Sequence, residues 1–230
     1  MIVAVLFIWL LAVGAAFYLV RHDLAQKPWL EPGGGTLTAD EREPTSATGL
    51  VMVLAVVGVV FALVISAFLM RAGDADWVTP PAPPLLWFNT GLLIVSSLGL
   101  EGAARASARR QAGRAEALLL LGAVTACAFI LAQIFAWREM TAAGFGVGSN
   151  VGAAFFYLMT GLHGAHLLGG LVALAITLAQ TRGDILGQTA RTRVKFCAMY
   201  WHFLLLVWLF LFALLQGWGG GLVALCRGLI

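Results

Sequence analysis

Five polar side chains lie inside long apolar stretches of this sequence, where a polar group is costly unless it has a partner or a function. They are Glu101, Gln133, His163, His166 and His202. Carboxylates and imidazoles carry protons and bind metals, and amides form hydrogen bonds. The chemistry to consider is therefore proton transfer, metal ligation or hydrogen bonding between helices.

Glu101 stands near the end of its apolar stretch, and Arg105 follows one helical turn later. Glutamate followed by arginine at i,i+4 is the favourable order for an ion pair on a helix. We therefore expect a local ion pair at the level of the lipid headgroups. A carboxylate that relays protons is the alternative.

His163 and His166 are three residues apart, which places both rings on one side of a helix. Helical histidine pairs can bind metals, but no carboxylate or thiolate follows at ligand spacing. A cytochrome with two haems would use four axial histidines, and only three of the four lie in apolar stretches, because His22 is in a loop. We expect no metal site here and predict hydrogen bonds between helices or contacts with lipid headgroups.

His202 lies roughly 12 Å inside its apolar stretch, about two helical turns from the start. This depth predicts a partner for its ring within the bundle. A second pattern, the small residues Gly161, Ala165 and Gly169, forms a stripe on the helix that carries the histidine pair. Small residues let helix backbones approach closely in membranes, so we expect this stripe to pack against a neighbouring helix.

The elements that hold these residues are membrane helices. The chain has 230 residues, of which 61% are hydrophobic and 11% charged, with a mean hydropathy of +0.93. Soluble domains carry about 25% charged residues. The net charge of +3 is spread over loops, which argues against nucleic-acid binding. Cys127, Cys197 and Cys226 show no metal or disulfide spacing and are expected to be packing residues.

Six apolar runs are long enough to span a bilayer, which takes about 20 residues. They cover residues 2–20, 49–70, 85–104, 115–137, 151–180 and 194–215. Lipid cannot satisfy the open backbone groups of strands, so the predicted fold is an all-α polytopic membrane helix bundle with six transmembrane helices.

Basic residues set the expected orientation, because loops rich in Lys and Arg stay in the cytoplasm. The loops near 105–114 and 182–195 are basic and are predicted to be cytoplasmic, which leaves both termini outside. The predicted organisation is an extra N-terminal helix at 1–20 and a flexible cytoplasmic linker at 21–48. A five-helix core at 49–216 and a Gly-rich tail at 217–230 follow.

Motifs of soluble enzymes are missing from the sequence, including a P-loop, a Gly-x-Ser-x-Gly elbow and a Cys-x-x-Cys pair. No residue is therefore predicted to be catalytic. Buried histidines without a catalytic set favour a scaffold protein or one subunit of a larger machine.

Four segments carry more specific patterns. Residues 156–166 read FYLMTGLHGAH, and YWHF at 200–203 is followed by VWLFLF at 207–212. The others are Asn89-Thr90 with Ser96-Ser97, and Gln133 with Trp137. In this order the segments resemble subunit III of the haem–copper terminal oxidases over about residues 85–215.

The resemblance implies a non-catalytic subunit of a respiratory oxidase in the bacterial inner membrane. In that family subunit I holds the haems and copper, and subunit II usually passes electrons. Subunit III binds neither haem nor copper, packs on subunit I, holds phospholipids in a cleft, and supports sustained oxygen reduction and proton uptake. Lipid-binding or interhelical polar contacts are then expected from His163, His166, Arg193, Trp201 and His202.

Two departures from the family pattern concern carboxylates. Val56 and Val57 stand where the family often has Ser-Glu, and Ala136 replaces the Glu of Gln-x-x-Glu-Trp. Glu101 is left as the deep-lying carboxylate and the candidate for a proton-related role. Alternatives are a subunit III-like component associated with nitric oxide reductase, a small membrane transporter, or a redox cytochrome. Cytochrome c and quinol are both compatible electron donors.

Overall fold

The computed structural model describes residues 39–72, 74, 77–181 and 187–218. These ranges contain five α-helices, α2 (Ala39–Arg71), α3 (Leu85–Ala108), α4 (Ala112–Ala142), α5 (Val151–Thr181) and α6 (Gln188–Leu215). The chain forms two compact units, and the second unit, Phe68–Leu229, contains α3 to α6. The predicted helix at 2–20 and the tail beyond residue 218 lie outside the described residues.

All five described helices are long and apolar enough to cross a membrane, which confirms the all-α polytopic prediction for this part of the chain. Two of the predicted helix starts are wrong. Residues 39–48, assigned to the linker, are the first part of α2, and α6 begins at Gln188 instead of residue 194. An apolar run marks the stretch in hydrocarbon, whereas backbone hydrogen bonding continues the helix into polar residues on either side.

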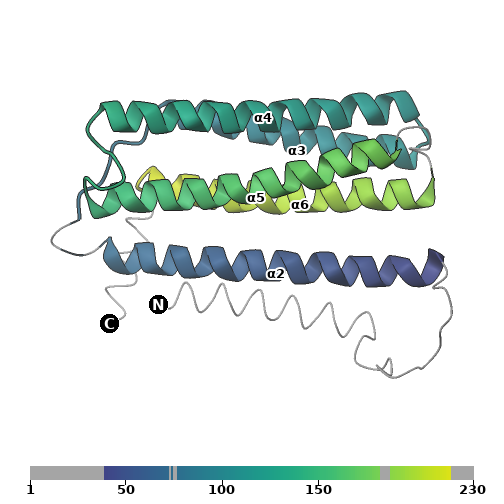
Figure 1. Ribbon diagram of the computed structural model, residues 1–230, viewed down its shortest axis with the longest axis horizontal. Coiled ribbons are helices and arrows are strands. Elements are labelled where there is room, and N and C mark those ends of the chain that lie inside the picture. The colour runs from purple at the N-terminus through teal and green to yellow at the C-terminus, as the bar shows by residue number, and fades with distance from the viewer. Residues whose placement is uncertain (1–38, 73, 75–76, 182–186, 219–230) are drawn as a thin grey trace, which may run out of the picture. The chain divides into compact units, whose positions relative to one another are not determined.

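Helices α3 to α6 form an antiparallel four-helix arrangement in which α3 lies against α4 and α6, and α5 lies against the same two helices (Figure 1). The α3–α4 turn lies at the same end of the bundle as the end of α5 and the start of α6 (Figure 1). The basic α3–α4 turn and the basic first turns of α6 therefore lie at the same end of the bundle.

Helix ends are defined by residues in the left-handed conformation. Arg110 (φ 59°), Gly144 (φ 87°) and Gly217 (φ 76°) follow α3, α4 and α6, and the next backbone N–H groups donate back into the last turn. At the start of α5, the Asn150 side chain accepts a hydrogen bond of 2.8 Å from the Ala153 N–H. Local chain chemistry therefore sets where these helices stop and start.

Large aromatic rings fill the core of the bundle. Phe129, Phe156, Trp201 and Trp208 are almost completely buried. The ring centroids of Phe129 and Trp208 lie 4.9 Å apart in an edge-to-face arrangement. Because lipid tails are as apolar as the core, such packing and hydrogen bonding, and not exclusion of water, holds the helices together.

Among the described residues, only Gly161 of the predicted packing stripe contacts a neighbouring helix, so packing by the stripe as a whole stays a prediction. Ala165 and Gly169 are exposed, and no atom lies within 4 Å of a Cβ built on Gly169. The close approach of α5 to α6 is made by Gly170, where an added Cβ would lie 2.8 Å from Tyr200 Cε1 and 2.9 Å from Trp201 Cζ3. Gly161 makes an ordinary contact with Trp137.

Candidate functional site in the interhelical polar network

Three tryptophans donate their indole N–H to a hydroxyl on a neighbouring helix. The pairs are Trp208 with Thr90 (3.0 Å), Trp201 with Ser96 (2.9 Å) and Trp137 with Thr160 (3.0 Å). Each hydroxyl donates in turn to a backbone carbonyl, so both polar groups are satisfied without water. The indoles therefore fix α6 against α3, and α4 against α5, in one register.

An amide pair joins α3 to α4. The Asn89 side-chain N–H donates to Gln133 Oε1 at 2.8 Å, and both residues are buried. Asn89 Oδ1 and Gln133 Nε2 have no hydrogen-bond partner among the described residues. An unsatisfied buried polar group costs about 1–3 kcal/mol, so this pair favours a specific helix register at some expense in stability.

A chain of four polar side chains, which we call the polar ladder, connects α3 to α6. His202 Nδ1 lies 2.6 Å from Ser97 Oγ, and His202 Nε2 lies 3.2 Å from Glu101 Oε2. Arg105 Nε–H donates to Glu101 Oε1 at 2.8 Å. The expected ion pair of Glu101 and the expected partner for His202 within the bundle are both present.

The direction of the hydrogen bonds follows from the carboxylate. Ionised Glu101 can only accept, so His202 Nε2–H donates to it. In the neutral ring Nδ1 is then the acceptor, and the Ser97 hydroxyl donates to it. The ladder thus runs from a buried hydroxyl, through an imidazole, to an ion pair whose arginine side chain is 71% exposed.

The two histidines of α5 lie in different environments. The His163 ring is fully buried, with its centroid 5.8 Å from that of Phe129 and 5.1 Å from that of Trp208. His166 is half-buried, and its Nδ1 lies 2.8 Å from the Leu162 carbonyl of its own helix. Among the described residues no three His, Cys, Asp or Glu side chains come together as metal ligands.

The residues predicted to contact lipid or other helices differ in how far they are buried. Trp201 and His163 are fully buried and have no surface to offer to lipid. Arg193 is exposed in the first turns of α6, and His166 is half-buried, so lipid contact stays a prediction for these two. Trp201 instead makes the interhelical bond to Ser96.

The residues of α3 that take part in these hydrogen bonds were predicted only as part of the family pattern. Asn89 and Ser96 are seven residues apart, and so are Thr90 and Ser97. Seven residues are almost two helical turns, so each pair lies on one side of the helix. This spacing was the available signal that α3 presents a polar seam to its neighbours.

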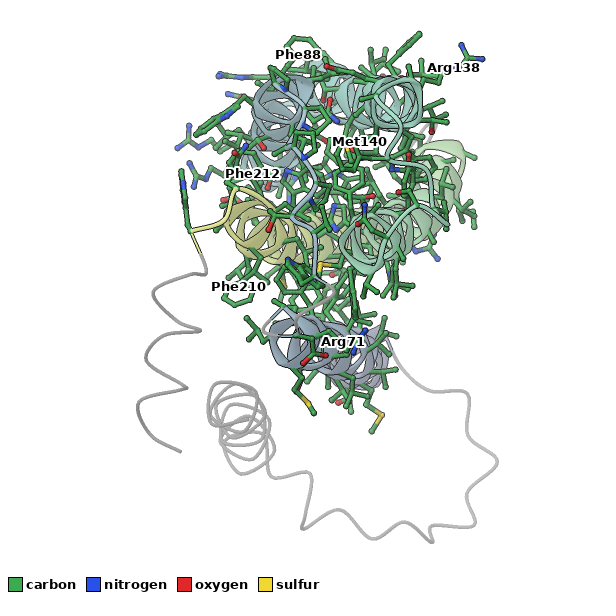
Figure 2. All side chains as sticks on the ribbon, turned by 90° about the vertical axis from the view of Figure 1, so that its left-hand side faces the viewer. Arg71, Phe88, Arg138, Met140, Phe210 and Phe212 are labelled. Atoms are coloured by element: carbon green, nitrogen blue, oxygen red, sulfur yellow. The ribbon has the colours of Figure 1, made fainter. Side chains whose placement is uncertain are left out.

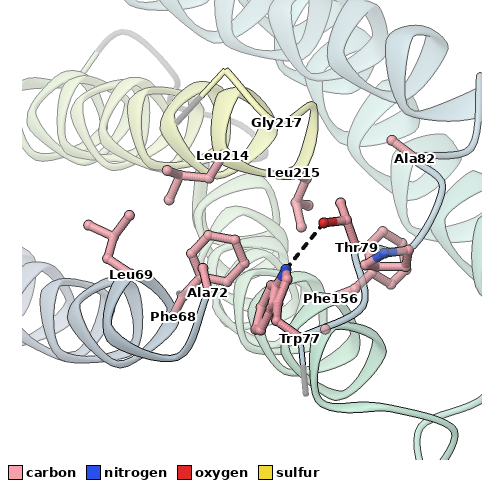
Figure 3. Close-up of a pocket in the computed structure, with 12 residues that line it drawn as sticks. Phe68, Leu69, Ala72, Trp77, Thr79, Ala82, Phe156, Leu214, Leu215 and Gly217 are labelled. Atoms are coloured by element: carbon pink, nitrogen blue, oxygen red, sulfur yellow. Dashed lines mark hydrogen bonds between the residues drawn. The ribbon is translucent and has the colours of Figure 1, made fainter. Parts of the chain in front are cut away.

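An apolar pocket of about 220 Å³ lies at the opposite end of the second unit from the α3–α4 turn. Its wall includes Phe68, Trp77, Phe156 and Leu215, and Trp77 donates its indole N–H to Thr79 Oγ1 at 3.2 Å (Figure 3). Among the described residues, no titratable side chain lines the pocket. Its chemistry suits an apolar chain.

A more open groove lies between the end of α4 and the start of α5. Trp137, Arg138, Thr141 and Tyr157 are among its lining residues, and the hydroxyls of Thr141 and Tyr157 lie 2.9 Å apart. Arg138 points away from the bundle, whereas Met140 lies between the helices (Figure 2). A cation beside aromatic rings and hydroxyls is suited to an anionic headgroup.

The polar network lies in a region that is shared with known proteins. The family model described as Cytochrome c oxidase subunit III matches residues 74–220, which include all of α3 to α6. The chain belongs to the cytochrome c oxidase subunit III family.

Similar members of this family occur in several organisms. Cytochrome c oxidase subunit 3 of Alkalihalophilus pseudofirmus is 30% identical over 169 residues, covering 70% of this chain and 82% of the relative. Cytochrome bo(3) ubiquinol oxidase subunit 3 of Pseudomonas aeruginosa is 34% identical over 132 residues, or 56% of this chain and 62% of the relative. Cytochrome c oxidase subunit 3 of Chondrus crispus is 31% identical over 134 residues, or 58% and 48%. The match spans less than two thirds of the latter two proteins.

Proposed function

We propose that this chain is the non-catalytic subunit III of a bacterial haem–copper respiratory oxidase and packs on subunit I in the inner membrane. Family membership supports the oxidase assignment. The observation that carries the non-catalytic part is the internal use of the polar groups. The indoles, the amide pair and the ladder histidine all bond to neighbouring helices. Such a chain contributes a packing surface and stability to a complex, and leaves redox chemistry to its partner.

The cofactors of the proposed complex belong to the partner. Haem and copper are assigned to subunit I, while this chain takes structural phospholipids. Two features support lipid binding: the apolar pocket bordered by Phe68 and Trp77, and the groove with Arg138 and Tyr157. Bound lipid and the packing on subunit I together would support sustained oxygen reduction and proton uptake.

The proposed topology has six transmembrane helices and both termini outside. It is supported by the basic α3–α4 turn and the basic first turns of α6, which lie at one end of the bundle (Figure 1). In a chain without its native cysteines, Arg110→Cys should react with a thiol reagent only from the cytoplasmic side. Gly148→Cys should react only from the outside. The opposite labelling pattern would reverse the orientation.

Purification of the tagged chain from its native membrane tests the oxidase assignment. We expect a haem-containing partner subunit to co-purify and the complex to reduce oxygen with either reduced cytochrome c or quinol, which also identifies the donor. A partner that reduces nitric oxide and not oxygen would move the chain to the nitric oxide reductase alternative. Solute transport by the isolated chain, or stoichiometric haem in it, would reject the proposal altogether.

The supporting role in turnover is tested by His202→Leu. Removal of the ring breaks the link between Ser97 and Glu101, so α3 and α6 are held less firmly. We expect a shorter working life of the complex with an initial rate near that of wild type, since the reaction centre lies in another chain. Immediate loss of oxygen reduction in His202→Leu would contradict a supporting role.

A further inference from the structure

The polar ladder is exposed on the second unit, on two helices that are long and apolar enough to cross a membrane. Ser97 lies at the middle of the 24-residue helix α3. With the middle of α3 placed at the centre of a hydrocarbon layer that extends about 15 Å to each side, Glu101 lies about 6 Å from that centre, deeper than the headgroup level expected from the sequence. The side chains of Glu101 and His202 are nevertheless 31% and 42% exposed in the described part of the chain. An ionisable pair is thus open to its surroundings within the membrane.

Lipid tails are a poor covering for this face. They offer no hydrogen bonds, and each polar group left against hydrocarbon costs free energy. The outward face of α4 shows what a surface suited to lipid looks like in this protein. Between residues 120 and 135 its exposed side chains are aliphatic, apart from Phe135 and the thiol of Cys127. Glutamate, arginine and histidine together distinguish the α3–α6 face.

Apolar side chains flank the ladder on both helices. Ile94 and Leu98 precede Glu101 on one side of α3, and Leu206 and Leu209 follow His202 on one side of α6. All four are exposed, and their spacing of three and four residues is the spacing that a packed helix contacts. The face therefore combines an apolar packing surface with a polar centre.

The polar ladder also determines which chemical groups can cover it. Glu101 already accepts from His202 and Arg105 through its two oxygens. The guanidinium of Arg105 uses its Nε–H in this pair, and its two terminal nitrogens carry four further N–H donors. A covering group must therefore present acceptors, such as a carboxylate or an uncapped carbonyl, at the level of Arg105.

We propose that the α3–α6 face, centred on the polar ladder, is the docking surface for a transmembrane helix of the partner oxidase subunit. That helix packs its small or apolar side chains against Leu98 and Leu206 and places a hydrogen-bond acceptor beside Arg105. Docking removes the ladder from lipid and surrounds the ion pair with protein, where a charge-assisted hydrogen bond is specific and strong. This inference rests on the proposed function, because it names the surface by which the subunit joins its complex.

Site-specific photocrosslinking in the intact complex tests the docking surface. A photoreactive residue is placed at Leu98, beside the ladder, or at Leu131 on the outward face of α4. The two positions have similar exposed fractions, 64% and 59%. We expect Leu98 to give a crosslink to a second membrane-spanning polypeptide, while Leu131 gives adducts with lipid. An equal protein crosslink from Leu131, a crosslink from Leu98 to lipid only, or one to residues 2–20 of the same chain would overturn the proposal.

A charge variant gives an independent measurement. Glu101→Gln keeps the shape of the side chain but removes the charge that orients Arg105. The affinity of the chain for the partner subunit in detergent should fall about tenfold, the factor that 1.4 kcal/mol produces. Glu116→Gln is the matched control, because Glu116 is exposed near the start of α4. Equal affinity in both variants, measured at normal helical content, would contradict a role of the ladder in docking.

The outcomes separate this inference from the proposed function. If no oxidase subunit co-purifies with the wild-type chain, the proposed function fails. If the partner co-purifies but crosslinks through α4 and not through Leu98, only the docking surface is wrong.

Discussion

Adding one methyl group at Gly170 tests how α5 packs against α6. A Cβ at this position would lie 2.8 Å from Tyr200 Cε1, and 2.9 Å and 3.1 Å from two ring carbons of Trp201. Carbon atoms in favourable contact are about 3.5–4.0 Å apart, so the methyl group is about 0.7 Å too close. The Trp201 ring is fully buried and held by its bond to Ser96, so relief requires α5 to move away from α6.

The neighbouring Gly169 provides the reference for the change in the free energy of unfolding. Gly169→Ala adds the same methyl group with no atom within 4 Å, and it should stabilise the helix by up to about 1 kcal/mol, the propensity gain of alanine over glycine. Gly170→Ala makes the same gain but pays about 1–3 kcal/mol for overpacking. Because the propensity terms cancel, the two variants should differ by about 1–3 kcal/mol in the free energy of unfolding.

Unfolding of the purified chain in mixed detergent micelles, followed by tryptophan fluorescence, gives both free energies. A third variant sharpens the comparison, because Trp201→Phe removes the ring carbons that the methyl group meets. In the Trp201→Phe background Gly170→Ala should lose most of its penalty, although Trp201→Phe alone is destabilising. Equal stability of Gly169→Ala and Gly170→Ala, or an unchanged penalty without the indole, would refute this account of the packing.

Three further changes probe other parts of the network. Trp208→Phe removes the indole bond to Thr90 and should lower the free energy of unfolding by about 1–3 kcal/mol. In the double variant with Thr90→Val, the loss of stability should be smaller than the sum of the two single losses, because both changes remove the same hydrogen bond. Asn150→Ala removes the cap of α5 and should cost about 1 kcal/mol, seen as earlier exchange of the Ala153 amide hydrogen. Arg110→Gly relieves a left-handed backbone and should raise the unfolding midpoint, with a gain of up to about 1 kcal/mol; a lower midpoint would show that the arginine side chain matters more than its backbone conformation.

Much of the fold could be read from the order of residues. Apolar runs predicted the five described helices to within a few residues at most ends, because the thickness of the bilayer imposes a minimum length. Glycine at positions 144 and 217 and asparagine at 150 mark helix ends through local chemistry. The ion pair of Glu101 with Arg105 was also predictable, since both residues lie on one helix at a fixed spacing.

Contacts between helices could be anticipated less well. The sequence predicted a packing stripe on Gly161, Ala165 and Gly169, and it did not indicate that Gly170 makes the close approach of α5 to α6 in the described part of the chain. A rotation of one residue is about 100°, and only the neighbouring helix decides which side of α5 is covered. Similarly, His202 was expected to have a partner, but nothing in its own helix indicated Ser97 and Glu101 on α3.

Composition and periodicity therefore determined by themselves that this chain is a bundle of membrane helices, and the motif order along it indicated the subunit III family. Only the tertiary structure decided which polar residues meet. It paired Trp201 with Ser96 and Trp208 with Thr90 inside the bundle, and it left the polar ladder open on an outer face. The physical reason is that burial in lipid makes every polar group need a partner, whereas the identity of that partner depends on the rotation and register of a second helix.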